Sequence, residues 1–535
     1  MASAAHAMEE SSSGMVASAH QCASQAGCKI LEAGGSAFDA AVAVAAALNV
    51  VEPYMSGLAG MGFATMWVAA EARVRVLDFV PPIPLSFPVG RFTSREELLS
   101  GPAAVASPGN LAGWCALHQA YGRLPLPQVL APAITLAEQG FEFSPFGIEE
   151  VAEFAPGHVA TPGTGEAFSA AFPFHTTLRA GDQVQAPMLA ATLRQVAEGG
   201  ADVLYRGELG SRMVAFLAEQ GGTLTLDDLA SVSPIWRDPL SATYRGLRIH
   251  VPPPPCEDFQ FLLTLRLLEG FDVAALEPLS VEHLDLVIRA IRLAAGVRIA
   301  DNRPDEARLR AILSDENVRL LQDRLRVGDG LQGPTEQWTS EPPPGADPGH
   351  TTSFSIADRE GNLVCITQSL GSVFGSGVAV PGTGVLLNNF LYWADVQPGS
   401  PNLARPGQPL AMCMAPSIST RDGKPCLALG TPGSYGILQT QAQALVSHLD
   451  FGLDLQAAIN APRARLWDGR LVEIENRVAP EVVAALRERG HDARPFPSAF
   501  TMHVGGMQAI GRDPRTDHLS GAADPRRNGA VMAAR

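Results

Sequence analysis

The hydrophobic and polar positions of the chain follow two periods, which predicts helices and strands in one fold. Apolar residues recur at helical spacing over residues 15–33 and again over 38–51. Ser36 precedes the second run, and Glu52-Pro53 follows it. A serine caps the free N–H groups at the start of a helix, and the residue before a proline disfavours helix. We therefore expect one helix in each stretch.

Shorter apolar stretches rich in β-branched and aromatic residues predict strands. They lie at residues 62–69, 74–79 and 247–252, and helical patterns cover about 108–144, 282–302, 435–460 and 479–490. No period of 20 to 50 residues repeats along the chain. Helices mixed with hairpin strands favour a layered α+β fold over alternating βαβ units.

The clearest alternation of apolar and polar residues follows residue 350. The segments 352–358 and 363–370 flank the polar turn 359–362, which predicts a hairpin. Residues 328–350 precede it and are poor in apolar residues and, toward their end, rich in proline and glycine. We expect a mobile connection there, so that Thr351 and Thr352 stand between a flexible segment and a strand.

Charge and cysteine content narrow the possible partners. The chain has 535 residues and a formal charge of −16, which argues against binding nucleic acid or an anionic membrane. Its seven cysteines include no CxxC pair, so they are neither a disulfide framework nor a zinc module. Residues 1–20 show no secretory signal, and the apolar run 41–51 is too short to span a bilayer. We expect a cytoplasmic protein that needs no metal or organic cofactor.

The candidate chemistry centres on Thr351. The sequence has no HExxH, GxxxxGK[ST] or GxSxG motif. A threonine hydroxyl becomes a useful nucleophile when the residue begins a chain, because its own α-amino group can act as base. Cutting the His350–Thr351 bond would create that arrangement. The same hydroxyl can cut it by attacking the His350 carbonyl to form an ester that water hydrolyses. By itself, the pair Thr351-Thr352 fits an ordinary strand start equally well.

The wider sequence resembles the γ-glutamyltransferase family of N-terminal-nucleophile amide hydrolases over nearly its whole length. The similar segments occur in the family's order: 14–63, 106–141, 351–377, GVLLNN, GTPGSYG, NAPRAR and AADPRR. This resemblance implies a four-layer αββα sandwich and a precursor that cuts itself before Thr351. The products would be a large subunit, 1–350, and a small subunit, 351–535, which together form one composite domain.

The resemblance also implies roles for five residues. Thr351 would be the nucleophile, with its freed amine as base, and Thr352 would support it. Ser369 stands where the family usually has a threonine whose hydroxyl assists processing and the nucleophile. Gly433 and Ser434 occupy the family's Gly-Gly position, whose backbone N–H groups form the oxyanion hole. His350 would remain as the end of the large subunit, without a catalytic role.

The positions that bind the substrate in the family hold different residues in this chain. Positions where the family binds the charged head of glutamate hold Val80, Gly371, Phe390, Trp393, Met412 and Cys413 in this chain. The family's carboxylate-binding arginine and ammonium-binding aspartate are both missing. Burying a zwitterion without charged partners costs several kcal/mol. A pocket lined by Val80, Phe390, Trp393 and Met412 suits an uncharged or aromatic acyl group.

Three functions follow from this pattern. The first is an amidase or acylase whose acyl-enzyme is hydrolysed by water, acting on a small amide. The second is γ-glutamyl transfer or glutathione hydrolysis, with charge recognition supplied by residues such as Arg405 or Asp395. The third is an unprocessed family member that acts as a scaffold or binding protein. Subunit composition separates the third from the others, and a choice of anilide substrates separates the first two.

Overall fold

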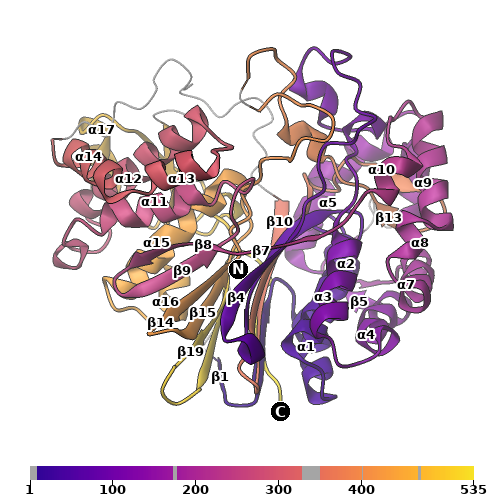
Figure 1. Ribbon diagram of the computed structural model, residues 1–535, viewed down its shortest axis with the longest axis horizontal. Coiled ribbons are helices and arrows are strands. Elements are labelled where there is room, and N and C mark those ends of the chain that lie inside the picture. Colours follow the sequence, from indigo (N-terminus) through magenta and orange to yellow (C-terminus); the bar gives the residue numbers. More distant parts are fainter. Residues whose placement is uncertain (1–8, 173–177, 328–349, 401, 468–470) are drawn as a thin grey trace.

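Two seven-stranded sheets stack face to face, and a layer of helices covers the outer surface of each (Figure 1). The computed structural model describes residues 9–172, 178–327, 350–400, 402–467 and 471–535. This is the four-layer αββα arrangement that the sequence resemblance implied. The expected mobile connection 328–350 lies outside the described residues except for His350.

The first sheet, sheet I, has helices α11 to α17 on its outer side (Figure 1). Its strands in spatial order are β1 (Glu9–Ser11), β20 (Leu519–Ala523), β19 (Gln508–Arg512), β15 (Lys424–Gly430), β14 (Ser417–Arg421), β9 (Leu247–Val251) and β8 (Leu240–Tyr244). The helices are α11 (Phe259–Leu268), α12 (Val281–Ala300), α13 (Glu306–Ile312), α14 (Asp315–Arg326), α15 (Ile437–Leu449), α16 (Leu455–Asn460) and α17 (Pro480–Glu488). Apolar side chains of these helices and of sheet I form one buried core.

The second sheet, sheet II, has helices α1 to α10 on its outer side (Figure 1). Its strands in order are β21 (Ala530–Ala533), β2 (Gly14–Ser18), β10 (His350–Asp358), β11 (Leu363–Gly371), β3 (Met61–Val68), β4 (Arg73–Phe79) and β7 (Ile235–Arg237). The helices are α1 (Gln21–Glu32), α2 (Ala37–Val51), α3 (Asn110–Tyr121), α4 (Leu126–Gln139), α5 (Pro145–Val159), α6 (Gly165–Ala171), α7 (Pro187–Gly199), α8 (Asp202–Tyr205), α9 (Glu208–Glu219) and α10 (Leu226–Ala230).

Three small sheets complete the fold. They are β5 (Phe141–Glu142) with β6 (Gln183–Val184), β12 (Ala379–Val380) with β13 (Val385–Leu386), and β16 (Ala464–Leu466) with β17 (Leu471–Ile474) and β18 (Asp492–Pro495). Sheets I and II each contain strands from before and after residue 350, so neither part of the chain builds a whole sheet. Among the described residues, no helix is both long enough and apolar enough to cross a bilayer.

Helix α2 begins and ends where its sequence predicted, because local contacts fix its start and Pro53 follows its end. The Ser36 hydroxyl accepts from the Asp39 N–H and the Asp39 carboxylate accepts from the Ser36 N–H, a capping box that fixes the start of α2. Every residue of α2 is buried, because neighbouring helices and sheet II surround it. The helix ends at Val51, directly before Glu52-Pro53, as the sequence predicted.

The predicted helix over residues 15–33 is wrong in its first part. Residues Gly14–Ser18 form β2, which pairs with β10 and β21, and α1 begins only at Gln21. Met15 and Ala17 pack between the two sheets, whereas Val16 packs on the helix side. This alternation has a period of two, which belongs to a strand.

The predicted hairpin is confirmed as β10 and β11, which pair antiparallel around the turn at 359–362. Both strands are buried along their whole length. The polar side of their alternation therefore faces sheet I and not solvent. Ser355 Oγ donates to the Gln508 carbonyl oxygen of β19 at 3.2 Å, and Ser353 Oγ lies 3.1 Å from Thr367 Oγ1.

Candidate active site

The candidate nucleophile, Thr351 in β10, lies opposite a β-bulge in the neighbouring strand β11. His350 pairs with Gly371 and Thr352 pairs with Gln368, so Ser369 and Leu370 lie opposite the single residue Thr351. Bulges redirect side chains and are frequent beside active sites. Thr351 sits in a central strand of sheet II with 6% of its surface exposed. The fold therefore holds this residue in a buried, non-standard position of the ladder.

The bulge brings the Ser369 hydroxyl to the peptide bond that precedes Thr351. Ser369 Oγ donates to the His350 carbonyl oxygen at 2.7 Å and accepts from the Gly371 N–H at 2.8 Å. A donor on this oxygen polarises the carbonyl carbon and stabilises negative charge that develops on the oxygen. The Thr351 hydroxyl belongs to the next residue, so the candidate attacking group and the polarised carbonyl are neighbours in the chain.

The side chain of His350 is anchored to α5. Its Nε2 lies 3.2 Å from Glu150 Oε2, and its ring meets the Phe154 ring edge to face at 5.3 Å. The His350 side chain is 4% exposed. These contacts fix the residue on the large-subunit side of the expected cut, as Ser369 fixes its carbonyl group.

On the other side of that bond, the fully buried Arg527 contacts the backbone and is paired with the fully buried Glu52. Arg527 Nη1 donates to the Thr351 carbonyl oxygen at 2.6 Å, and its Nη2 lies 2.8 Å from Glu52 Oε2. Thr352 Oγ1 donates to the same Glu52 oxygen at 3.4 Å. Burial raises the pKa of Glu52, while Arg527 and Thr352 oppose the rise.

The turn that carries Gly433 and Ser434 follows β15. That strand ends at Gly430, which packs so closely on β10 and β11 that an added Cβ would meet Ser353 Oγ at 2.1 Å. Gly433 has φ 133° and Ser434 has φ 52°, a left-handed conformation that a serine rarely adopts. The Gly506 N–H donates to Thr431 Oγ1 at 3.1 Å and anchors the turn. The oxyanion role of Gly433 and Ser434 stays a prediction.

The structure brings together four of the predicted substrate-binding residues. Phe390 and Met412 belong to one apolar cluster, and Val80 and Trp393 pack against it. Phe390 and Met412 are each 1% exposed, whereas Val80 and Trp393 are partly exposed. Trp393 and Val80 therefore offer the accessible surface of this cluster, and their role in binding stays a prediction.

The other two predicted substrate-binding residues, Cys413 and Gly371, are not members of this apolar cluster. Cys413 is buried in the core between sheet I and its helices, because successive residues of an extended chain point to opposite sides. Gly371 has φ 103°, and an added Cβ would meet Asn389 Oδ1 at 2.1 Å. The glycine is therefore needed for the close approach of the β11 end to Asn389, which accepts from the Ser372 N–H at 2.9 Å.

Next to the turn after β15, the rings of Trp393 and Tyr435 and the guanidinium group of Arg298 pack one against the next. We call this group the aromatic column; the sequence did not predict it. The Tyr435 ring lies 5.6 Å from the Trp393 ring, and the Arg298 guanidinium carbon lies 3.9 Å from its centre. Arg298 is fixed by Gln260 at 2.6 Å and by Glu257 at 3.3 Å. Burial raises the pKa of Tyr435 well above its usual range. Trp393 therefore packs against Tyr435, the residue that directly follows Ser434.

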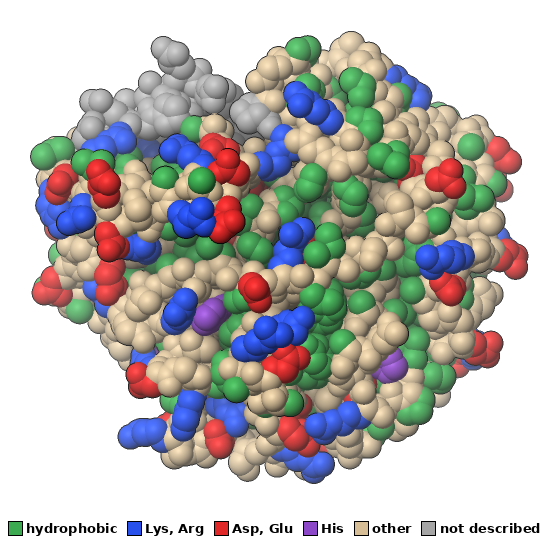
Figure 2. All heavy atoms as spheres, in the orientation of Figure 1, with side chains coloured by type: hydrophobic (Ala, Val, Ile, Leu, Met, Phe, Trp, Pro, Cys, Tyr) green, Lys and Arg blue, Asp and Glu red, His purple; other side chains and the backbone are tan. Residues whose placement is uncertain are grey.

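Hydrophobic side chains gather along the seam between the two helical sides on the face drawn in Figure 2. Within the described ranges, no group of three or more His, Cys, Asp or Glu residues is placed to hold a metal ion.

Comparison with known proteins places this geometry in one family. The family model described as Gamma-glutamyltranspeptidase matches residues 23–534. The chain is 34% identical to the "Acylase ACY 1 proenzyme" of Pseudomonas sp. (strain SE83) over 98% of this chain and 94% of that protein. It is 29% identical to the "Glutathione hydrolase proenzyme" of Bacillus subtilis (strain 168) over 97% of this chain and 91% of that protein.

The solved structures agree with the sequence matches. The crystal structure of cephalosporin acylase from Bacillus halodurans superposes with a TM-score of 0.88 at 30% identity, covering 99% of this chain and 97% of that one. The family model, the curated relatives and this structure all span nearly the whole chain. The protein belongs to the gamma-glutamyltranspeptidase family, also called the γ-glutamyltransferase family.

Proposed function

We propose that the protein is a self-processing amide hydrolase that uses Thr351 as nucleophile on a small amide with an uncharged or aromatic acyl group. The observation that carries the proposal is the contact between the Ser369 hydroxyl and the His350 carbonyl oxygen at 2.7 Å. It aims a donor at the one peptide bond whose cleavage would free the Thr351 amine. Two relatives whose names call them proenzymes support the processing step.

Processing needs only groups of this chain and one water molecule. Thr351 Oγ attacks the His350 carbonyl carbon, and Ser369 stabilises the oxyanion. The C–N bond breaks as the Thr351 nitrogen takes up the hydroxyl proton, which leaves an ester between the His350 acyl group and Thr351 Oγ. Water hydrolyses this ester. The products are a carboxylate on His350 and a free α-amino group on Thr351.

Turnover would repeat the same chemistry on an external amide. The neutral Thr351 amine accepts the proton of its own hydroxyl while Oγ attacks the substrate carbonyl carbon. The proton then passes to the leaving amine as the amide C–N bond breaks, and an acyl ester remains on Thr351. A water molecule, deprotonated by the same amine, attacks the ester and releases the acid. Gly433 and Ser434 are the proposed N–H donors to both tetrahedral oxyanions.

The proposed acyl class rests on the apolar cluster and the aromatic column. Val80 and Trp393 present apolar surface, and Trp393 is supported by Tyr435. An aromatic acyl group gains from area burial and from ring contacts. A zwitterionic glutamyl head would lose its hydration there without charged partners in the family positions.

A second candidate function is γ-glutamyl transfer or glutathione hydrolysis. The similarity to a glutathione hydrolase proenzyme favours it. It would need charged groups from the loop after Trp393, where Arg405 is exposed and Asp395 accepts from the Gln397 N–H at 3.0 Å. An unprocessed chain without catalytic activity is the third candidate.

One substrate panel separates these candidates. Purified wild-type protein and Thr351→Ala would be assayed with the para-nitroanilides of phenylacetate, butyrate and γ-glutamate. We expect wild type to release nitroaniline from the phenylacetyl or butyryl compound at least tenfold faster than from the γ-glutamyl one, and Thr351→Ala to release none. A preference for γ-glutamyl anilide, enhanced by a dipeptide acceptor, would establish the second candidate. Equal rates for wild type and Thr351→Ala would remove Thr351 from the mechanism.

A further inference from the structure

The strongest unassigned feature is the buried ion pair that holds the backbone of the candidate nucleophile. Arg527 donates to the Thr351 carbonyl oxygen at 2.6 Å and pairs with Glu52 at 2.8 Å. The side chains of Glu52 and Arg527 have 0% exposure. Taking two charges out of water is costly unless they are paired and hydrogen-bonded. Here one of these hydrogen bonds goes to the nucleophile itself.

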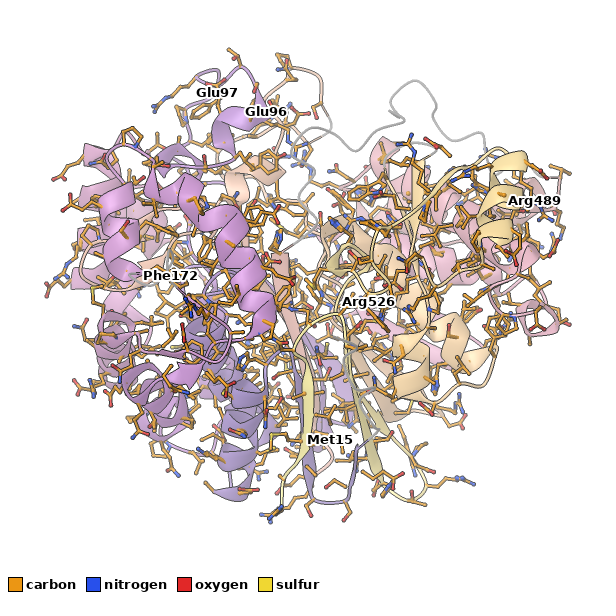
Figure 3. The ribbon with its side chains drawn as sticks, turned by 180° about the vertical axis from the view of Figure 1, so that it is seen from behind. Met15, Glu96, Glu97, Phe172, Arg489 and Arg526 are labelled. Atoms are coloured by element: carbon orange, nitrogen blue, oxygen red, sulfur yellow. The ribbon has the colours of Figure 1, made fainter. Side chains whose placement is uncertain are left out.

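The pair also joins the two sides of the expected cut. Glu52 follows α2 in the part before residue 350, whereas Arg527 lies between β20 and β21. In Figure 3 its neighbour Arg526 lies near the centre of the molecule, well above Met15 along the sheets. After cleavage at His350, the Glu52–Arg527 contact would connect the large subunit to the first residue of the small one.

We propose that Arg527 and Glu52 are positioning residues that hold Thr351 through its carbonyl group, and that their opposite charges set how readily its freed amine takes up a proton. This inference rests on the proposed function, because only a cut chain has that amine. It assigns to the pair a role in activity as well as in stability.

Coulomb's law gives the direction in which Arg527 and Glu52 each shift the pKa of the Thr351 amine. The amine nitrogen and the carbonyl oxygen belong to one residue, so the guanidinium group lies within roughly 6 Å of the amine. A positive charge there disfavours the protonated amine, and the negative charge of Glu52 favours it. Only the neutral amine can act as base, so activity rises with pH through the pKa of this amine. Arg527 moves that rise to lower pH, and Glu52 moves it to higher pH.

Two further titratable groups feel the charges of this pair and stay neutral near pH 7. Burial and the nearby charge of Arg527 lower the pKa of His20 to about 4. Burial and the charge of Glu52 raise the pKa of Tyr54 well above its usual range. Neither group changes its charge in the range where the Thr351 amine titrates.

Helix α5 contributes one more charged group on this side of Thr351. Glu150 lies 3.2 Å from the ring of His350, whose own backbone would become a carboxylate after the cut. The Glu150 side chain and the His350 carboxylate are present in wild type and in every variant of Glu52 or Arg527. A difference in pH dependence between those proteins therefore reports on the pair.

The test compares Glu52→Gln and Arg527→Met with wild type, each expressed as the full chain. Self-cleavage is followed in the freshly purified precursor, and kinetics are measured on the complex of both parts after the cut. Arg526→Met is the matched control, because Arg526 is equally buried and pairs with Asp524 at 3.0 Å and Glu475 at 2.7 Å. If Arg526→Met does not fold, Arg245→Met replaces it, since Arg245 pairs with the buried Asp450 at 2.7 Å on sheet I. The readouts are the rate of self-cleavage and kcat/KM of the fastest anilide from pH 5 to 10.

We call the rise of kcat/KM with pH, which follows the pKa of the Thr351 amine, the acid limb. We expect the midpoint of this limb to lie about one pH unit lower in Glu52→Gln and about one unit higher in Arg527→Met than in wild type. Arg527→Lys, which keeps the charge, should lie within about half a unit of wild type. The control variant should keep the wild-type limb. A folded Glu52→Gln chain that stays uncut beside a normally cut control would also support the positioning role.

Two results would overturn the inference. One is a wild-type acid limb in both Glu52→Gln and Arg527→Met. The other is a shift of equal size and sign in these variants and in the control, which would indicate a general loss of stability. Failure of the proposed function looks different, because wild type would then stay uncut, or Thr351→Ala would keep its activity.

Discussion

Ser369 donates its hydroxyl hydrogen to the carbonyl oxygen of His350 across 2.7 Å. The contact exists because the bulge in β11 sets Ser369 opposite Thr351 in the sheet ladder. That oxygen is the atom on which negative charge would develop when Thr351 attacks the bond before it. Under the proposed mechanism, this structural contact would also become a donor to the transition state of self-cleavage.

Removing this donor should slow self-cleavage. We expect Ser369→Ala to be cut about 100-fold more slowly than wild type, which is the usual cost of losing one oxyanion donor. Ser369→Thr should be cut within about fivefold of wild type, because the hydroxyl remains. Timed samples of freshly purified precursor, separated on a denaturing gel, give the rates.

The matched control for Ser369 is Ser353→Ala. Ser353 is a buried serine of the same hairpin, and its hydroxyl donates to the Ile366 carbonyl oxygen at 3.1 Å. We expect this variant to lose about 1 kcal/mol of stability and to be cut at the wild-type rate. A Ser369→Ala precursor that is cut as fast as Ser353→Ala would contradict the donor role.

The left-handed conformation of Ser434 makes a second prediction. A glycine adopts φ 52° without the Cβ penalty that a serine carries there. Ser434→Gly keeps the backbone N–H, so we expect kcat within twofold of wild type and a free energy of unfolding raised by up to about 1 kcal/mol. Urea titration and anilide kinetics measure the two quantities. A tenfold lower kcat would show that the serine side chain, and not only its N–H, takes part.

The control for Ser434 lies in a surface turn. Ala72 has φ 49° between β3 and β4, so Ala72→Gly relieves the same kind of conformation at a distance from the turn after β15. We expect a comparable gain in stability and unchanged kinetics from it.

The aromatic column predicts an effect on substrate choice. Trp393→Ala removes a ring that lies 5.6 Å from Tyr435, and ring pairs contribute about 0.5–1.5 kcal/mol. We expect kcat/KM for phenylacetyl anilide to fall roughly two- to tenfold, with a smaller change for the butyryl compound. Trp236→Ala is the control, because its ring lies 5.5 Å from Tyr121 on the α3 side. Equal losses for both acyl groups would contradict direct contact with Trp393.

Local patterns predicted much of the frame that holds Thr351. The turn residues 359–362 and the alternation on both sides predicted the β10–β11 hairpin, and Ser36 predicted the start of α2. These elements depend on contacts between residues that are close in sequence. The strand Gly14–Ser18 was missed because its partners, β10 and β21, lie hundreds of residues away.

The surroundings of the nucleophile were harder to predict for the same reason. Glu52 and Arg527 meet across 475 positions of the sequence, and nothing local marks them as partners. A single acidic residue directly after the apolar stretch 38–51, and a double arginine in AADPRR, were the available signals. Tyr435 beside Ser434 was also missed, because its role depends on its contacts with Trp393 and Arg298.

The intact mass of the purified protein under denaturing conditions, beside a Thr351→Ala control, tests most directly whether Thr351 is a self-generated N-terminal nucleophile. We expect two fragments, one ending at His350 and one beginning at Thr351, and a single uncut chain in the control. A wild-type protein that remains one 535-residue chain for days would contradict this mechanism, because no free amine would exist to act as base.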